Sequence, residues 1–83
     1  MNRYRDKTQI YKAILTCLPQ PKTRIMYIAT LGHRQLNDHL DDMLQLGLIK
    51  PLSQTPRNSW VYGITYKGQD YLEKINYLIS LQQ

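Results

Sequence analysis

Hydrophobic positions in the first half of the chain recur at spacings of three and four residues, the pattern of helices that each bury one face. This pattern predicts three helices, over residues 4–18, 23–30 and 33–46. Pro19 and Pro21 should end the first helix, because proline cannot continue one. Thr23 should cap the second helix through its hydroxyl, and Gly47 suits the left-handed position that follows the third.

After Gly47 the pattern changes to short segments of bulky and branched side chains, which are typical of strands. Residues 48–64 are therefore expected to form a hairpin with a polar, exposed tip over residues 53–59. Pro51 lacks the amide hydrogen that a central strand needs, so its strand should lie at an edge, as in a two-stranded ribbon.

A last helix is predicted over residues 66–81, with Thr65 as its cap. Its apolar side chains share one face. A body this small cannot cover the far end of that face, so we expect the helix to pair with its copy in a homodimer. The alternative is packing on the first helix of the same chain. The interface residues would be Tyr71, Leu72, Ile75, Leu78 and Ile79.

The order helix, helix, helix, strand, strand, helix predicts an α+β, mostly helical fold: a winged helix-turn-helix in a single domain over residues 1–83. The second and third helices would form the helix-turn-helix. The hairpin would form the wing, and the third helix would be presented to a groove of nucleic acid.

The 83-residue chain has a formal net charge of +5, and the whole excess lies in residues 1–31. This uneven charge points to a polyanionic partner, although a surplus of this size also serves solubility. The single cysteine excludes an intramolecular disulfide, and no apolar run is long enough to span a membrane. We therefore expect a cytoplasmic protein without a membrane contact. A basic arm ahead of the first helix contains Arg3, Arg5 and Lys7.

Short motifs occur in one order along nearly the whole chain: Thr23-Arg24-Ile25-Met26-Tyr27, Gln35-Leu36 with Leu40, Gly47-Leu48-Ile49, and Thr65 with Lys67-Gly68 and Leu72. In these motifs the sequence resembles the small stand-alone winged helix-turn-helix regulators common in archaea. The resemblance implies a protein that binds double-stranded DNA, commonly as a homodimer, and regulates transcription. The chain departs from the family at Gly32 and His33, where relatives usually have serine and an aromatic residue.

The third predicted helix offers the candidates for contact with bases. Its inward face should consist of Leu36, Leu40, Met43 and Leu44. The N-terminal half of such a helix reaches base edges, which selects Arg34, Gln35 and Asn37. Arg34 could fork onto guanine, and the amide of Gln35 or Asn37 could pair with adenine.

Phosphate contacts are expected from the start of the second helix and from the hairpin tip. Lys22, Thr23 and Arg24 lie where backbone amides and the positive end of the helix dipole face outward. Arg57, together with Asn58, is placed to reach the DNA backbone or the minor groove.

Three acidic residues, Asp38, Asp41 and Asp42, make the third helix net negative, which opposes contact with phosphate. Asp38 could pair with Arg34 one turn earlier or accept from a cytosine amino group, and we expect the pair with Arg34. The acidic helix keeps a second hypothesis open, a winged-helix protein-interaction module that does not bind DNA. The residues alone do not distinguish RNA from DNA.

The sequence favours no enzyme, metal site, cofactor or small-molecule effector. His33 is predicted to pack into the core, His39 lies to the side of the third helix, and Cys17 lies on the buried stripe of the first. Neither histidine has a cysteine or carboxylate pattern around it. The chain has no phosphate-binding glycine loop and no nucleophile with a base at a recognisable spacing.

Overall fold

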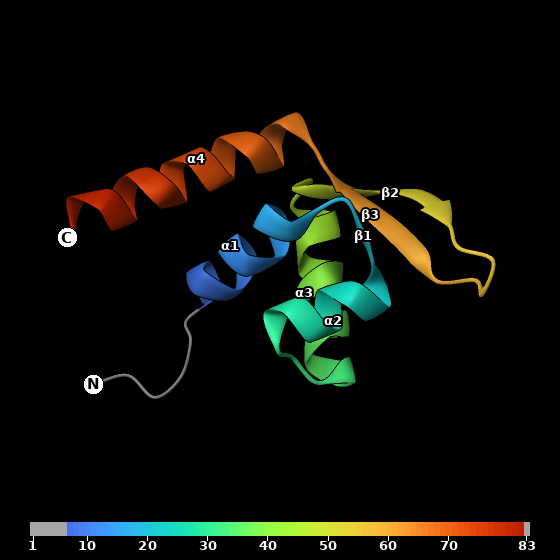
Figure 1. Ribbon diagram of the computed structural model, residues 1–83. Helices are drawn as coiled ribbons and strands as arrows, with labels where there is room; N and C mark the ends of the chain where they lie inside the picture. The colour runs from blue at the N-terminus through green and yellow to red at the C-terminus, as the bar shows by residue number, and fades with distance from the viewer. Residues whose placement is uncertain (1–6, 83) are drawn as a thin grey trace.

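The computed structural model describes residues 7–82, which form four helices and three strands (Figure 1). In chain order these are α1 (Lys7–Cys17), β1 (Gln20–Pro21), α2 (Lys22–Ala29), α3 (His33–Gln45), β2 (Ile49–Gln54), β3 (Trp60–Ile64) and α4 (Tyr66–Leu81). The predicted helices and the hairpin are all found, in the predicted order. The start of the first helix at residue 4, and the arm residues Arg3 and Arg5, lie outside the described residues.

Helices α1, α2 and α3 enclose the core. The predicted inward face of α3 is confirmed, with buried or core-packed side chains at Leu36, Leu40, Met43 and Leu44. Ile14 of α1 and Ile25 of α2 are fully buried with Leu36 and Met43. Burial of one such side chain contributes roughly 1.5–3 kcal/mol, so these four residues set how the three helices pack.

Helix α2 begins one residue earlier than predicted, and the prediction that Thr23 caps it is wrong. Pro21 occupies the N-cap position with extended backbone, and no side chain caps the helix there. The reason is non-local, because Pro21 pairs with Val61 of β3 and this pairing fixes where the extended backbone ends. Lys22 and Thr23 therefore both lie in the first turn of α2.

A three-residue turn, residues 30–32, joins α2 to α3. Thr30 adopts the left-handed conformation with φ of +51°, which is uncommon for a β-branched residue. The amide of Thr30 donates to the Tyr27 carbonyl and that of Leu31 to the Met26 carbonyl, each at 3.2 Å. These bonds satisfy the last carbonyls of α2 and redirect the chain, so α3 begins at His33 as predicted.

Within residues 7–82 the sheet has three antiparallel strands in the order β1-β3-β2, whereas the sequence predicts a ribbon of two. The additional strand is β1, residues 20–21, which pairs with β3. The prolines at this position predict only the end of the first helix. The edge position of Pro51 is confirmed, since β2 has a neighbour on one side alone. A bulge between Pro51 and Ser53 inserts Leu52, whose side chain covers Gly63.

A set of contacts around Thr65 joins the end of α3 to the start of α4. The Thr65 hydroxyl donates to the Gly47 carbonyl and accepts from the Gly68 amide at 2.9 Å, which confirms it as the cap of α4. Its own amide donates to the Leu48 carbonyl at 3.1 Å. Gly47 has φ of +76°, as its predicted left-handed position requires. Two turns far apart in the sequence are thus bound to each other, and we call this set of contacts the Thr65 junction.

Helix α4 runs beside α1 and extends past it (Figure 1). Its predicted apolar face is divided between two environments. Tyr71 and Leu72 pack against the core, and Ile75 is buried at 3% exposure within its own chain. Ile79 is half-buried, and Leu78 is 56% exposed. The alternative of packing within one chain therefore holds for the first half of this face, and the second half remains uncovered.

We predict that Gly68→Ala lowers the free energy of unfolding by about 3 kcal/mol. A Cβ at this position would lie 2.0 Å from the Leu48 carbonyl oxygen, which is backbone and cannot move aside cheaply. The higher helix propensity of alanine, worth about 1 kcal/mol, is too small to offset this clash.

Urea titration followed by circular dichroism measures the change. Gly32→Ala is the control, because its Cβ would meet nothing closer than Gln35 Oε1 at 3.7 Å, and we expect a loss below about 1 kcal/mol there. Equal stability of the Gly68→Ala chain and the unsubstituted chain would contradict the close approach.

Candidate nucleic-acid interface

The exposed side of α3 carries Arg34 and Asp38, and the predicted ion pair between them is not formed. Within residues 7–82 the ion pairs are Lys7–Asp42 at 4.0 Å and Asp70–Lys74 at 2.9 Å. An exposed pair one turn apart gains only a few tenths of a kcal/mol, and the order with the cation first is the weaker one. Arg34 therefore has its guanidinium free to contact a ligand.

The Gln35 side chain is engaged at the start of α3. Its Oε1 accepts a hydrogen bond from the Gly32 amide at 3.2 Å. This contact is one half of a capping box and partly compensates for the missing hydroxyl at Gly32, which lacks a side chain to cap the helix. Gln35 would have to leave this bond to pair with a base, whereas the half-buried Asn37 makes no such contact with the helix start.

The two histidines of α3 lie in different environments. His33 is exposed, so the prediction that it packs into the core is wrong. It is the first residue of α3 and precedes the turns that meet the core, so its angular position does not bury it. His39 is half-buried instead and meets the Tyr11 ring edge-on, with 5.9 Å between centroids. Its Nδ1 is buried and has no hydrogen-bond partner among the described residues.

The start of α2 and the wing tip lie on one side of the molecule. Thr23 and Arg24 are exposed and Lys22 is half-buried in the first turn of α2. A groove of about 520 Å³ joins this turn to the hairpin, lined by Pro21, Thr23, Thr55, Pro56, Arg57 and Ser59. The structure thus brings together two groups of predicted phosphate contacts that are more than thirty residues apart.

The wing tip is a defined turn that presents Arg57. The Asn58 amide donates to the Thr55 carbonyl at 2.9 Å, and the Thr55 amide to the Ser59 carbonyl at 2.8 Å. Pro56 and Arg57 are the central residues of this turn, and Asn58 takes the left-handed conformation with φ of +63°. The strands pair as far as Gln54 and Trp60, so the tip is shorter than the predicted residues 53–59.

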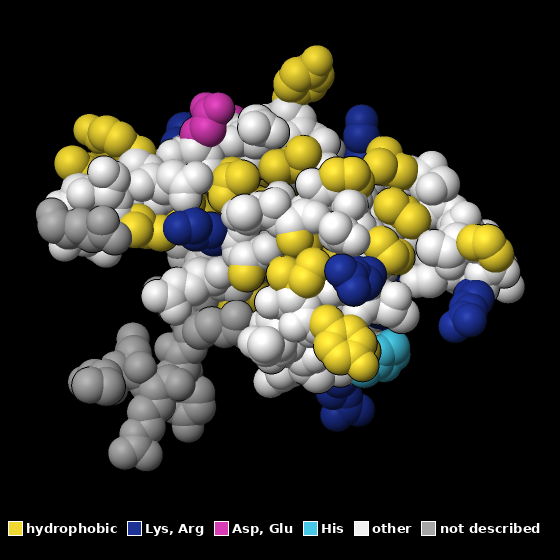
Figure 2. Space-filling model, viewed as in Figure 1, with side chains coloured by type: hydrophobic (Ala, Val, Ile, Leu, Met, Phe, Trp, Pro, Cys, Tyr) yellow, Lys and Arg dark blue, Asp and Glu magenta, His cyan; other side chains and the backbone are white. Residues whose placement is uncertain are grey.

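Two of the three acidic residues of α3 face other elements of the fold. Asp42 lies near Lys7 of α1. Burial raises the pKa of the Tyr11 hydroxyl, and the nearby Asp42 charge raises it further. In the same way burial, and then Asp41, raises the pKa of Tyr62 in β3. On the face drawn in Figure 2, basic side chains lie over the start of α2, at the wing tip and also over α4, where the acidic side chains of this face lie.

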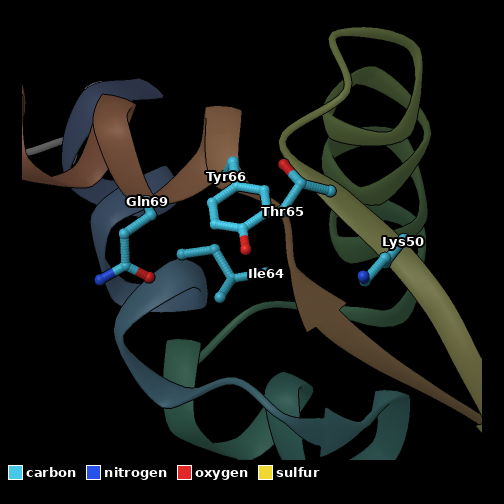
Figure 3. A pocket seen from close by; sticks show the side chains of 5 residues that line it. All are labelled: Lys50, Ile64, Thr65, Tyr66 and Gln69. Atoms are coloured by element: carbon cyan, nitrogen blue, oxygen red, sulfur yellow. The ribbon is translucent and has the colours of Figure 1, made fainter.

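A pocket of about 300 Å³ lies where β2 and β3 meet the start of α4 (Figure 3). Lys50 projects from β2, and Tyr66 and Gln69 project from α4. The remaining lining residues are Ile64 and Thr65, whose hydroxyl is already bound in the Thr65 junction. The lining holds neither a nucleophile with a base nor a pair of carboxylates, so the pocket offers no recognisable catalytic chemistry.

The described residues also bear on metal binding and on membrane insertion. In the described part of the chain, no three His, Cys, Asp or Glu side chains are grouped so that they could hold a metal ion. Over the same residues, no helix combines the length and hydropathy that crossing a membrane requires.

The thiol of Cys17 is half-buried and donates a hydrogen bond to the Ile14 carbonyl at 3.1 Å. Burial raises the pKa of this thiol.

A helical core with a helix-turn-helix, followed by an antiparallel hairpin and a long helix, defines a winged-helix protein. Residues 4–83 match the winged helix-turn-helix family, and the chain belongs to this family. The resemblance seen in the sequence motifs is thereby confirmed. None of the curated protein sequences compared with the chain matches it.

The structure is similar to solved structures of the same architecture. Sso10a-2, a DNA-binding protein from Sulfolobus solfataricus, has a TM-score of 0.82 and 25% identity over 94% of this chain and 82% of that chain. Staphylococcus aureus MarR, solved with salicylate and kanamycin, has a TM-score of 0.79 and 17% identity over 96% of this chain and 54% of that chain.

The transcriptional repressor CouR, solved on a 23-mer DNA duplex, has a TM-score of 0.72 and 17% identity. That match covers 88% of this chain and 52% of the CouR chain. The likeness to MarR and CouR concerns the fold, and this chain spans about half the length of each.

We predict that Asn58→Val lowers the free energy of unfolding by about 1–2 kcal/mol, because a β-branched residue is strained in the left-handed conformation. Asn58→Gly, which adopts this conformation freely, should leave stability unchanged or raise it slightly. Thermal unfolding of both variants makes the comparison. If the valine variant is as stable as the glycine variant, the wing tip does not have the turn described above.

Proposed function

We propose that this protein binds double-stranded DNA with sequence preference, as a homodimer, and regulates transcription. The proposal rests mainly on the position of the first turns of α3. They project from a core-anchored helix and carry an exposed Arg34, which has no ion-pair partner among the described residues, with Asn37 one turn later. The N-terminal half of a helix held in this way suits insertion into the major groove, where an arginine discriminates guanine by two hydrogen bonds.

The start of α2 and the wing supply the contacts that hold the duplex. Thr23 and Arg24 are exposed at an uncapped helix start whose backbone amides face outward. Such a start attracts phosphate through its free N–H groups and its dipole. Arg57 stands on a preformed turn across the groove from Thr23, so a phosphate backbone following this side would meet both. Membership of the family and the named activity of Sso10a-2 support this assignment.

The uncovered end of α4 supports the homodimer. Tyr77, Leu78 and Leu81 are between 56% and 65% exposed on a helix that extends past α1. Pairing of two such ends would remove these side chains from water. Of the predicted interface, Leu78 and Ile79 remain available, whereas Ile75 is already buried within the protomer. Two-fold pairing would place the two α3 helices for a palindromic site.

A second candidate function rests on Asp38. This residue is exposed and has no ion-pair partner among the described residues, although it lies one turn from Arg34 on the surface assigned to bases. A negative charge there opposes phosphate and would suit a basic protein partner. A winged-helix protein-interaction module would therefore show no duplex binding even at low salt.

We predict that Arg34→Ala relaxes base preference and costs about 1–3 kcal/mol on the preferred site. Arg57→Ala should instead weaken all duplexes alike, because a phosphate contact carries no sequence information. Selection from a random duplex pool supplies the preferred site, and fluorescence anisotropy at two salt concentrations measures affinity.

Affinity should fall steeply as salt rises, because bound phosphates release counterions. A competing RNA duplex of the same sequence separates DNA from RNA binding. An Arg34→Ala chain that keeps the full preference would exclude Arg34 as the base contact, and binding that ignores salt would exclude the phosphate contacts.

We predict that Leu78→Asp converts a dimer into a monomer, because a charge would be buried at the centre of the α4 contact. Sedimentation equilibrium measures the mass. Tyr66→Asp is the matched control, since Tyr66 is 98% exposed at the opposite end of the same helix and its loss should leave the mass unchanged. An unchanged mass for Leu78→Asp would exclude this end of α4 as the interface.

A further inference from the structure

A second hydrophobic surface lies between α1 and α2, apart from the residues assigned to DNA and from the exposed end of α4. It is a shallow groove of about 380 Å³, lined by Gln9, Lys12, Ala13, Thr16, Cys17 and Ile28. Ile28 is 44% exposed, and Ala13 and Cys17 are only partly buried. A large aliphatic side chain is thus left partly in water beside a shallow apolar hollow.

One charged residue, Lys12, lines this groove. Helices α1 (Lys7–Cys17) and α2 (Lys22–Ala29), which form its two sides, carry no acidic residue. Lys12 lines the groove itself, and the Thr16 hydroxyl beside it is bonded to the Lys12 carbonyl at 2.6 Å. The rim therefore presents a cation next to an apolar floor. A partner that matches this arrangement needs apolar side chains flanked by carboxylates.

We propose that the α1–α2 groove binds an acidic amphipathic helix of another protein, whose apolar side chains pack on Ala13, Cys17 and Ile28 while its carboxylates face Lys12. Helices of this kind bind shallow apolar grooves through side chains at spacings of three and four. Charge complementarity at the rim selects acidic helices over basic ones. The groove shares no residue with the start of α2, α3 or the wing, so occupation of the groove and contact with DNA use separate surfaces.

Cys17 provides a reporter inside the groove, because it is the one cysteine of the chain. A bound helix would cover its thiol and slow its modification by 5,5′-dithiobis(2-nitrobenzoic acid). The reaction is followed at mildly alkaline pH, since burial raises the pKa of the Cys17 thiol and only the thiolate reacts.

The probe is a synthetic helical peptide of about 16 residues with leucine at the helical spacing and glutamate on the remaining face. The same peptide with every glutamate replaced by glutamine tests the charge. The full chain is compared with Ile28→Ser and Lys12→Glu, each expected to weaken protection about tenfold. Leu52→Ser and Lys50→Glu, which alter exposed residues on β2 outside the groove, are the matched controls and should leave protection unchanged.

The proposal holds if the glutamate peptide protects Cys17, the glutamine peptide does so at least tenfold more weakly, and only the groove variants lose protection while their circular dichroism spectra are retained. It is overturned if both peptides protect equally, or if Lys50→Glu loses as much as Lys12→Glu. Displacement of the peptide by duplex DNA would overturn it by assigning the groove to the nucleic acid. Protection that rises with protein concentration alone would overturn it by assigning the groove to a second copy.

Discussion

The Thr65 junction is the constraint on which the arrangement of this molecule depends. One hydroxyl caps α4 through the Gly68 amide and binds the Gly47 carbonyl that follows α3. The backbone of α4 approaches the Leu48 carbonyl so closely that only glycine fits at position 68. Since β2 and β3 are connected between these two points, the junction fixes the base of the hairpin and the direction in which α4 leaves it.

This constraint separates the surfaces of the protein. The wing extends on one side of the junction and α4 on the other, where it passes α1 (Figure 1). The short strand β1 joins the start of α2 to the same sheet through the pairing of Pro21 with Val61. As a result the first turn of α2 and the wing tip share a groove, and the end of α4 is left exposed. The surfaces proposed for DNA contact and for self-association therefore lie at different ends of the fold.

The positions of the charged residues bear on DNA binding more directly than the net charge does. The sequence places an acidic helix at the centre of the proposed DNA surface, which opposes phosphate binding. In the fold Asp42 faces Lys7, and Asp41 lies near Tyr62, so Asp38 is the acidic residue nearest to Arg34 on the exposed side. Lys12, which belongs to the same basic surplus, lines the α1–α2 groove proposed for an acidic helix.

The sequence alone determined the features whose causes are local. Periodicity placed α3 and α4 and the inward side chains of α3, and the conformational demands of Gly47, Pro51 and Thr65 marked where elements end or begin. It did not place β1, the true start of α2 at Lys22, the exposure of His33 or the packing of His39 on Tyr11. Those features depend on contacts between segments distant in the chain. Only the tertiary structure decided them, because a helical wheel gives the direction of a side chain but not which neighbour, if any, lies there.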